Sequence, residues 1–447
     1  SIEVSPHDNA TAYIATTRYK FNDFTPGLFK TTDYGKTWVK INEGIPYGAF
    51  TRVVREDDVR KDLLYAGTET GFYISYNGGK NWSACQLNLP VVAITDLMIR
   101  QGDLVASTQG RAFWIFDDLS LFRQYDAAAK GFQLLRPEDA VRVSGFSPMD
   151  GPANDSEERG PSSPIGTNAP TGVVFYYVLP EKVDSAASLT LQIKDAQGAV
   201  VHAYSSEADK KFVSFPGGPN PDPTLSKKSG FNRFVWNMRY PSVEGAPNVY
   251  IEGSYRGHKA SPGAYTAILK YGSEEKTTTF SILPNPGIQA TAAEYQESHE
   301  FQSKVEAAIT EIHRAVNQLK EAKRQTEDLI KVLDTDASRK EIKDAAEALV
   351  KKITTWDEKV VQRKSESNDD IINFVNKISA DYIFLKGELD SNTPMVSQGA
   401  REQLDALNGL WKTYKAEYEE IVQKDVVNLN TLCRQKGVDK VSLPTSK

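Results

Sequence analysis

Polar side chains that could form a binding site flank strand-like segments in the first part of the chain. Four of them stand out, and they are Glu69, Arg111, Asp117 and Asp118. Binding groups gather at strand ends because the sheet holds the loops there in place. Carboxylates beside a guanidinium can recognise a polar ligand, although surface or inter-sheet salt bridges are their commoner role. We predict a polar binding surface here and no catalytic residue among the four.

The residue types that bind metals or carry out catalysis occur without the spacing that such sites need. Asp8-Asn9 and Asn22-Asp23 could contribute to a calcium loop, but no Asp/Asn ladder ending in Glu follows either pair. The sequence also lacks a phosphate-cradling glycine loop, a Gly-x-Ser-x-Gly elbow and a zinc-protease helix. We expect no metal and no cofactor. The histidines are scattered, with no Cys/His ligand pattern, at His7, His202, His258, His299 and His313.

An eight-residue motif occurs twice among these strand-like segments. Residues 31–38 fit the pattern Ser/Thr-x-Asp-x-Gly-x-Thr-Trp, and residues 75–82 repeat it with Asn77 for the aspartate and Asn81 for the threonine. A short carboxylate on a tight hairpin accepts backbone N–H groups, glycine adopts a positive φ, and tryptophan packs between sheets. The motif is therefore structural. Its residues are Thr31, Asp33, Gly35, Thr37 and Trp38, then Ser75, Asn77, Gly79 and Trp82.

The strands around the motif repeat as well. The two copies begin 44 residues apart, close to the 40 to 45 residues of one four-stranded propeller blade. Residues 64–68 reappear as residues 104–108, but the third copy ends in Asp117-Asp118 without a Gly-x-Thr-Trp sequence. Closed propellers use about four to eight blades. Three blade-like segments therefore leave a ring that upstream blades or a partner subunit must complete, and the resemblance described next implies upstream blades of the same parent protein.

The motif resembles the Asp-box of the bacterial neuraminidase (BNR) repeat, which also occurs in sortilin-like VPS10 propellers. Together with residues 110–118, it makes residues 1–125 similar to the final blades of large exported bacterial proteins that are often labelled glycosyl hydrolase. This resemblance implies an extracytoplasmic protein, either periplasmic, cell-surface or secreted. Sialidase-like chemistry would need an arginine cluster, a Tyr/Glu nucleophile pair and an acid/base aspartate from several blades. Three blades cannot supply that set.

The remaining chain divides into three further segments. Residues 126–171 are rich in Pro, Gly, Ser and Asn, and we expect a linker and irregular segment there. Residues 172–286 contain alternating β-strand runs and resemble an Ig-like β-sandwich. Residues 290–447 have helical periodicity in four apolar stripes, which predicts an antiparallel four-helix bundle. Expected helix starts are the capping boxes at Thr291 and Ser338, and Thr393 ahead of Pro394.

Composition excludes two classes of partner. The chain has 447 residues and a formal charge of −6, and no stripe of Lys and Arg with interleaved aromatic residues is present. Nucleic acid is therefore not an expected partner. No apolar run approaches the roughly 20 residues that span a bilayer, so we expect no transmembrane segment. Cys85 and Cys433 lie far apart in sequence and are expected to be free thiols.

Two functions remain open at this point. The first is a noncatalytic binding or assembly protein that uses the propeller as an interaction scaffold for a protein or carbohydrate ligand. The alternative is a glycoside hydrolase, sialidase-like, whose catalytic site lies in blades outside this chain. A cluster of carboxylates and arginines at the propeller axis would distinguish the second from the first.

Overall fold

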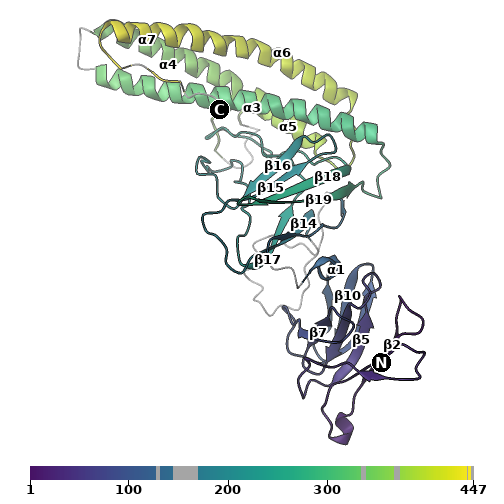
Figure 1. Cartoon of the computed structure of the whole chain (residues 1–447). Coiled ribbons are helices and arrows are strands. Elements are labelled where there is room, and N and C mark those ends of the chain that lie inside the picture. The colour runs from purple at the N-terminus through teal and green to yellow at the C-terminus, as the bar shows by residue number, and fades with distance from the viewer. Residues whose placement is uncertain (127–130, 144–169, 334–338, 367–372, 440, 444–447) are drawn as a thin grey trace. The chain divides into compact units, whose positions relative to one another are not determined.

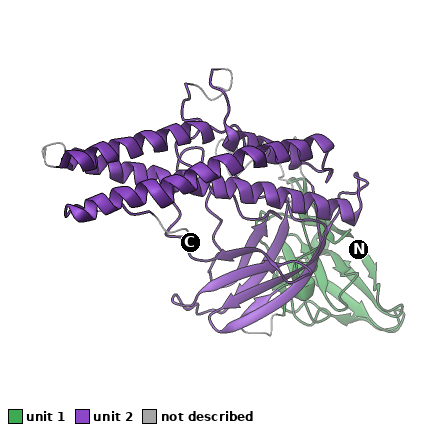
Figure 2. Cartoon of the chain, turned by 90° about the horizontal axis from the view of Figure 1, so that it is seen from above, with its two compact units in different colours: residues 1–130, 135–138 green, residues 131–134, 139–447 purple. Residues whose placement is uncertain are grey.

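The computed structural model describes residues 1–126, 131–143, 170–333, 339–366, 373–439 and 441–443. Two compact units are present (Figure 2). Unit 1 comprises residues 1–130 and 135–138, and unit 2 comprises residues 131–134 and 139–447. Each unit has its own hydrophobic cores.

Unit 1 consists of three small antiparallel sheets in chain order (Figure 1). Each sheet is a meander, because consecutive strands pair with one another. The first two sheets have four strands, whereas the third has three among the residues described, and a short helix, α1 (Ser120–Gln124), follows it. The sheets are β1 (Ile2–Val4), β2 (Ala12–Thr16), β3 (Gly27–Thr31) and β4 (Val39–Lys40); β5 (Thr51–Glu56), β6 (Leu64–Thr68), β7 (Phe72–Ser75) and β8 (Ser83–Ala84); and β9 (Ile94–Arg100), β10 (Asp103–Thr108) and β11 (Phe113–Phe116).

The middle sheet of unit 1 is covered on both faces. Tyr13 and Leu28 of the first sheet share a core with Leu64 of β6. On the other face, Tyr65 of the same strand packs in a core with Ile94 of β9. All five residues of β6 are consequently buried. A strand that is buried on both faces lacks the alternation of apolar and polar residues, and this explains the sequence of residues 64–68.

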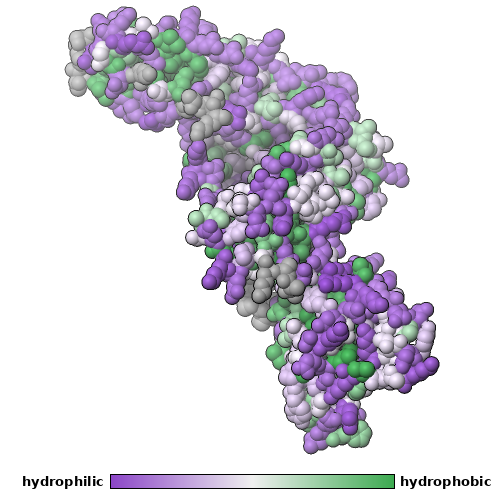
Figure 3. Space-filling view, viewed as in Figure 1, coloured by the Kyte–Doolittle hydropathy of each residue, from purple (hydrophilic) through white to green (hydrophobic). Residues whose placement is uncertain are grey.

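The outer faces of the first and third sheets remain uncovered. Ile2 and Val4 of the first sheet are 71% and 63% exposed. Met98, Phe113 and Ile115 of the third sheet are 58%, 75% and 59% exposed. Hydrophobic atoms are visible at the surface of unit 1 in Figure 3. Unit 1 therefore presents apolar side chains on both flanks of its stack of sheets.

Unit 2 begins with two sheets that enclose one core. Side chains of both sheets meet there, including Phe175, Trp236, Leu191 and Phe280. Within the expected linker, residues 133–134 and 140–141 form strands of these sheets, while its Pro- and Gly-rich part at 144–169 lies outside the described residues. The three-stranded sheet contains β12 (Gln133–Leu134), β14 (Val173–Leu179) and β17 (Gly230–Trp236). The five-stranded sheet contains β13 (Ala140–Val141), β19 (Glu274–Leu283), β18 (Gly263–Tyr271), β15 (Leu189–Lys194) and β16 (Val200–Ser205).

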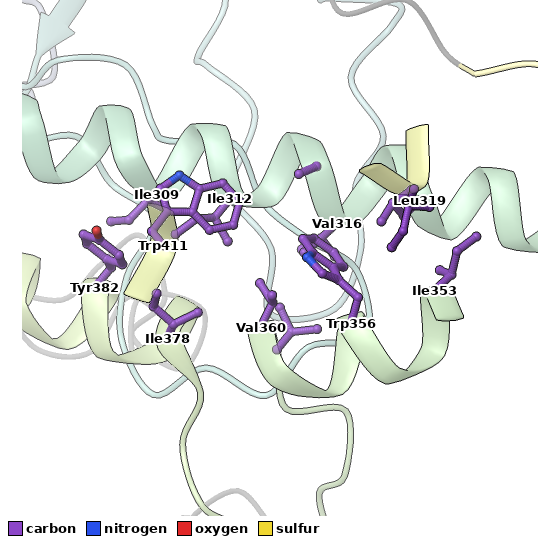
Figure 4. Packing of buried hydrophobic residues seen from close by; sticks show 14 of the residues in the cluster. Ile309, Ile312, Val316, Leu319, Ile353, Trp356, Val360, Ile378, Tyr382 and Trp411 are labelled. Carbon is purple, nitrogen blue, oxygen red and sulfur yellow. The ribbon is translucent and has the colours of Figure 1, made fainter. Parts of the chain in front are cut away.

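The C-terminal part of unit 2 is helical, as the periodicity predicts. The helices are α3 (Ala292–Leu333), α4 (Lys340–Val360), α5 (Ile378–Leu389), α6 (Gln398–Glu420) and α7 (Val426–Gln435), and a π-helical turn (Ile421–Asp425) joins the last two. Their apolar stripes form one core, in which Trp356 and Trp411 are buried together with Ile312 and Val316 (Figure 4). Val243, Ala246 and Tyr255, from the segment before β18, belong to the same core.

The helix starts differ in part from those expected. Thr291 and Glu294 form the predicted capping box ahead of α3, because each side chain bonds the other residue's backbone N–H. Ser338 lies outside the described residues. Thr393 does not cap a helix; Ser397 caps α6 instead, since its side chain accepts the Ala400 N–H at 3.1 Å.

Both cysteines are free thiols, as expected. Burial raises the pKa of Cys85 to about 11. No helix within the described ranges is long and apolar enough to cross a membrane.

Candidate functional site

One end of the three sheets in unit 1 gathers five connections. These are the β2–β3 loop (17–26), the β4–β5 loop (41–50), the β6–β7 turn (69–71), the β8–β9 loop (85–93) and the β10–β11 turn (109–112). The Glu69 N–H donates to the carbonyl of Phe50, and the Gln109 N–H donates to the carbonyl of Ala93, so the two turns occupy equivalent places in their sheets. We call this the loop end of unit 1.

An aromatic cluster covers the loop end. Tyr19 stacks on Phe50 with ring centroids 5.2 Å apart and planes 23° apart. Phe24 lies 6.2 Å from Phe50 and 6.3 Å from Tyr47. Phe50 is buried, whereas Tyr47 is 72% exposed and Phe21, on the same loop as Tyr19, is 81% exposed. Exposed aromatic rings held in place by buried ones are characteristic of binding surfaces.

The backbone of the two long loops holds these rings in position. Tyr19–Phe21 form a 3-10 turn, which ends at Asn22 in the left-handed conformation (φ +56°). The Asp23 carboxylate accepts the Thr25 N–H at 3.0 Å, and the Gly48 N–H donates to the Phe24 carbonyl at 3.1 Å. The loops are therefore ordered by their own hydrogen bonds, and a ligand would meet a preformed surface.

Two of the four residues predicted for a polar site lie at the loop end. Glu69 accepts the Arg52 Nε–H at 2.7 Å, and the Arg52 guanidinium lies 5.4 Å from the centre of the Phe50 ring. Glu69 is thus tied to the aromatic cluster through Arg52. Arg111 lies in the next turn, where its N–H donates to Thr108 and its carbonyl accepts the indole N–H of Trp114.

Asp117 and Asp118 lie at the opposite end of the third sheet, after β11. The Asp118 N–H donates to Asp103, and its carboxylate accepts the Ser120 N–H at 2.8 Å. Glu138 lies close by, and burial together with the charges of Asp118 and Asp103 raises the pKa of Glu138. The structure therefore divides the four predicted residues between two ends of unit 1, and they do not form one site.

The first motif copy forms a closed hydrogen-bonded hairpin at the end opposite the loop end. Asp33 accepts the Thr37 N–H at 2.9 Å and the Thr37 hydroxyl at 2.6 Å. The Thr31 hydroxyl donates to Asp33 and accepts the Gly35 N–H. Hydrogen bonds from Thr37 and then Thr31 lower the pKa of Asp33 to about 2. All oxygens of this carboxylate are used within the turn, so it has a structural role.

The second copy reproduces the turn with an uncharged side chain. The Asn77 amide oxygen accepts the Asn81 N–H at 3.0 Å and the Ser75 hydroxyl at 3.0 Å. The Gly79 N–H donates to the Ser75 hydroxyl at 3.0 Å. A single amide oxygen can thus replace the carboxylate as the organising acceptor.

The tryptophans of the two copies have different surroundings. Trp82 is 4% exposed, and its indole N–H donates to the Ile41 carbonyl of the preceding sheet at 2.6 Å. Its backbone N–H donates to the Glu43 carbonyl at 2.9 Å. The equivalent Trp38 is 38% exposed, and its indole N–H donates only within its own hairpin, to the Gly35 carbonyl. Trp82 packs against a neighbouring sheet, whereas Trp38 has no such neighbour among the described residues of unit 1.

The exposed aromatic side chains at the loop end form a surface that can contact a ligand. The described residues contain no group of three His, Cys, Asp or Glu side chains that could hold a metal. The aromatic cluster was missed by sequence reasoning because Tyr19, Phe24, Tyr47 and Phe50 follow no motif and are spread over two loops. The available signal was the concentration of aromatic residues in segments 19–24 and 47–50, between strand-like runs.

No protein-family profile matches the chain, and no curated protein is significantly similar to it. Similar solved structures are β-propeller proteins at low identity. A YCF48 structure bound to D1 peptide is 12% identical, covering 63% of this chain and 66% of that chain, with a TM-score of 0.21. YCF48 from Cyanidioschyzon merolae is 12% identical, covering 63% of this chain and 81% of that chain, with a TM-score of 0.20.

A GH74 xyloglucanase from Xanthomonas campestris is 11% identical, with a TM-score of 0.21. The match covers 62% of this chain and 38% of the xyloglucanase, so the chain spans well under half of that enzyme. At these values the likeness to solved structures assigns no function to this chain.

Proposed function

We propose that this chain is a noncatalytic, extracytoplasmic binding or assembly protein of the Asp-box (BNR/VPS10-like) kind. In this proposal unit 1 supplies three blades of a larger β-propeller, and its loop end contacts the ligand. The two sheets of unit 2 form an Ig-like module, and the helices form a C-terminal bundle. The extracytoplasmic location rests on the resemblance of residues 31–38 to the Asp-box.

The contrast between Trp82 and Trp38 carries the proposal. Trp82 is buried against the sheet that precedes it, and Trp38 is 38% exposed at the same position of the first sheet. The apolar flanks support the same interpretation, since Ile2 and Val4 on one side and Phe113 and Ile115 on the other are exposed. Proteins rarely leave such faces in contact with water. Further blades would bury both flanks.

The loop end is the proposed ligand surface. Phe21 and Tyr47 are the most exposed aromatic residues of its two long loops, and the ion pairs Arg52–Glu69 and Arg18–Asp23 leave it without strong net charge. Such a surface suits an uncharged part of a protein or carbohydrate ligand, where aromatic rings supply contact area at little entropic cost.

Binding arrays test the proposal. The full chain would be applied to an array of neutral and acidic glycans and to an array of tiled peptides. The double variant Phe21→Ala, Tyr47→Ala should lose at least about tenfold in affinity for whichever class binds, since two exposed anchors are removed. Val59→Ala is the control, because Val59 is 67% exposed at the opposite end of the sheets. Equal losses in both variants, or turnover of a bound glycan, would contradict the proposal.

A further inference from the structure

A chain of three side chains, buried at His258 and Glu306, joins residues 239–262 of unit 2 to helix α3. His258 is 2% exposed, and its Nδ1 lies 2.8 Å from the Glu306 carboxylate. Its Nε2 lies 2.8 Å from Nδ1 of His299. The His258 backbone N–H also donates to Glu306, at 2.7 Å. His258 is thus bonded to α3 through both its ring and its backbone, and Glu244 of the same segment is also bonded to α3, through Arg314.

The hydrogen-bond partners determine where the protons are. An ionised carboxylate only accepts, so Nδ1 of His258 carries a proton that it donates to Glu306. Nε2 of His258 is then the acceptor of the N–H on Nδ1 of His299. A first added proton can enter at Nε2 of His299 without breaking any bond of this chain. A second would place N–H groups on both of the facing nitrogens and break the link.

The surroundings of His299 favour its neutral form. Tyr240 stacks on both imidazole rings, at 4.4 Å from His258 and 5.2 Å from His299. Burial, and then the neighbouring His258, lower the pKa of His299. The charged groups around the pair are Arg239, Arg256 and Lys259 on the same segment, Lys386 on α5 and Asp390 directly after it, Asp195 in the β15–β16 turn, and Glu300 and Glu306 on α3. Lys386 is 2% exposed and donates to the Arg256 carbonyl, so a buried cation already lies against this segment.

A cavity of about 1320 Å³ lies beside the link and is lined in part by Tyr240, His258 and Glu306. It provides room for water next to the buried ring, and therefore a route for protons.

We propose that Glu306, His258 and His299 form a proton-sensitive latch, which holds the backbone around His258 on α3 at neutral pH and loosens as the pH falls below about 6.5. The direction of the pH dependence follows from the linkage between proton binding and docking. A histidine whose folded-state pKa is lowered binds more protons when the segment is released, so acid favours release. The stabilisation that His299 gives to the docked segment is present above its ordinary pKa of 6.5, and it is lost as the pH falls through the lowered pKa of His299 in the folded chain.

Hydrogen–deuterium exchange of the full chain at pH 7.5 and pH 5.0, corrected for intrinsic rates, tests the latch. The His258 N–H should exchange about tenfold faster at pH 5.0 than at pH 7.5, because protonation weakens the link that protects it. His299→Gln should abolish this acceleration. Its amide can donate to Nε2 of a neutral His258 and, after rotation, accept from a protonated one.

His7→Gln is the matched control, because His7 lies in unit 1 and bonds the Asp57 carbonyl. It should leave the pH dependence at His258 unchanged. If His299→Gln does not fold, the ring proton resonances of His299 in the unmodified chain decide the matter, and they should titrate together with the exchange. Equal protection at both pH values, or the same acceleration in His299→Gln, would overturn the proposal.

Discussion

At the scale of single residues, the motif turns show how a short acceptor organises a hairpin. Asp33 uses both carboxylate oxygens on Thr31 and Thr37, while Asn77 achieves a similar turn with one amide oxygen. The lowered pKa of Asp33, caused by these bonds, means that the folded turn holds the ionised form more strongly than the unfolded chain does.

Asp33→Ala should therefore lower the unfolding temperature of unit 1 at pH 7, whereas Asp33→Asn should lower it less, because asparagine still accepts the Thr37 N–H. A carboxyl group whose folded pKa is lowered stabilises above its ordinary pKa of 3.8 and loses that contribution as the pH falls through about 2. The difference between the unmodified chain and Asp33→Ala should shrink over this range. Near-UV circular dichroism melts would show it, and identical melting temperatures at pH 7 would refute this role.

At the scale of secondary-structure elements, packing between neighbouring sheets distinguishes equivalent tryptophans. Trp82→Phe should destabilise unit 1 by about 1–3 kcal/mol, because the Ile41 carbonyl would lose its donor in a buried position. Trp38→Phe removes a bond within an exposed hairpin and should have little effect. Urea unfolding of both variants measures the difference. A larger loss for Trp38→Phe would contradict the assigned packing.

The helices offer a matched pair on adjacent positions. Trp411 is 5% exposed and donates to Glu311 at 2.8 Å, whereas Leu410 is 49% exposed on the same helix, α6. Trp411→Ala should cost about 3–5 kcal/mol of unfolding free energy through loss of contacts and the cavity left behind. Leu410→Ala should stay within about 0.5 kcal/mol. Comparable losses in urea unfolding would mean that α6 buries a different face.

The elements also show what sequence reasoning can and cannot reach. The helical stripes, such as Ile312 and Val316, were predictable because apolar residues three or four positions apart lie on one face of a helix, and that face is the buried one. The π-helical turn at Ile421–Asp425 was not, since it changes the register without changing the residue types. Thr393 was a false helix start, because the same residue types suit caps and turns. His258 and His299 were seen only as isolated histidines, since 41 residues separate them in sequence.

At the scale of the whole molecule, unit 2 joins its sheets and helices through shared interior contacts. Glu306 and Lys386 have partners in residues 239–262, and Tyr255 packs in the helical core. A fragment of residues 290–447 would expose these groups. We expect it to keep helical circular dichroism but to melt at a lower temperature than residues 131–447. Equal melting temperatures would show that the helices gain nothing from the preceding segment.

The central claim is that further blades cover both flanks of unit 1, and methionine oxidation tests it most directly. Met98 lies on an outer flank and is 58% exposed, Met395 in unit 2 is 70% exposed, and Met238 is buried. Hydroxyl-radical footprinting would compare this chain with the natural protein purified intact from its source. In the isolated chain Met98 should oxidise at a rate near that of Met395. In the natural protein Met98 should be protected toward the level of Met238 while Met395 stays reactive. Oxidation of Met98 at the same rate in both would contradict the account.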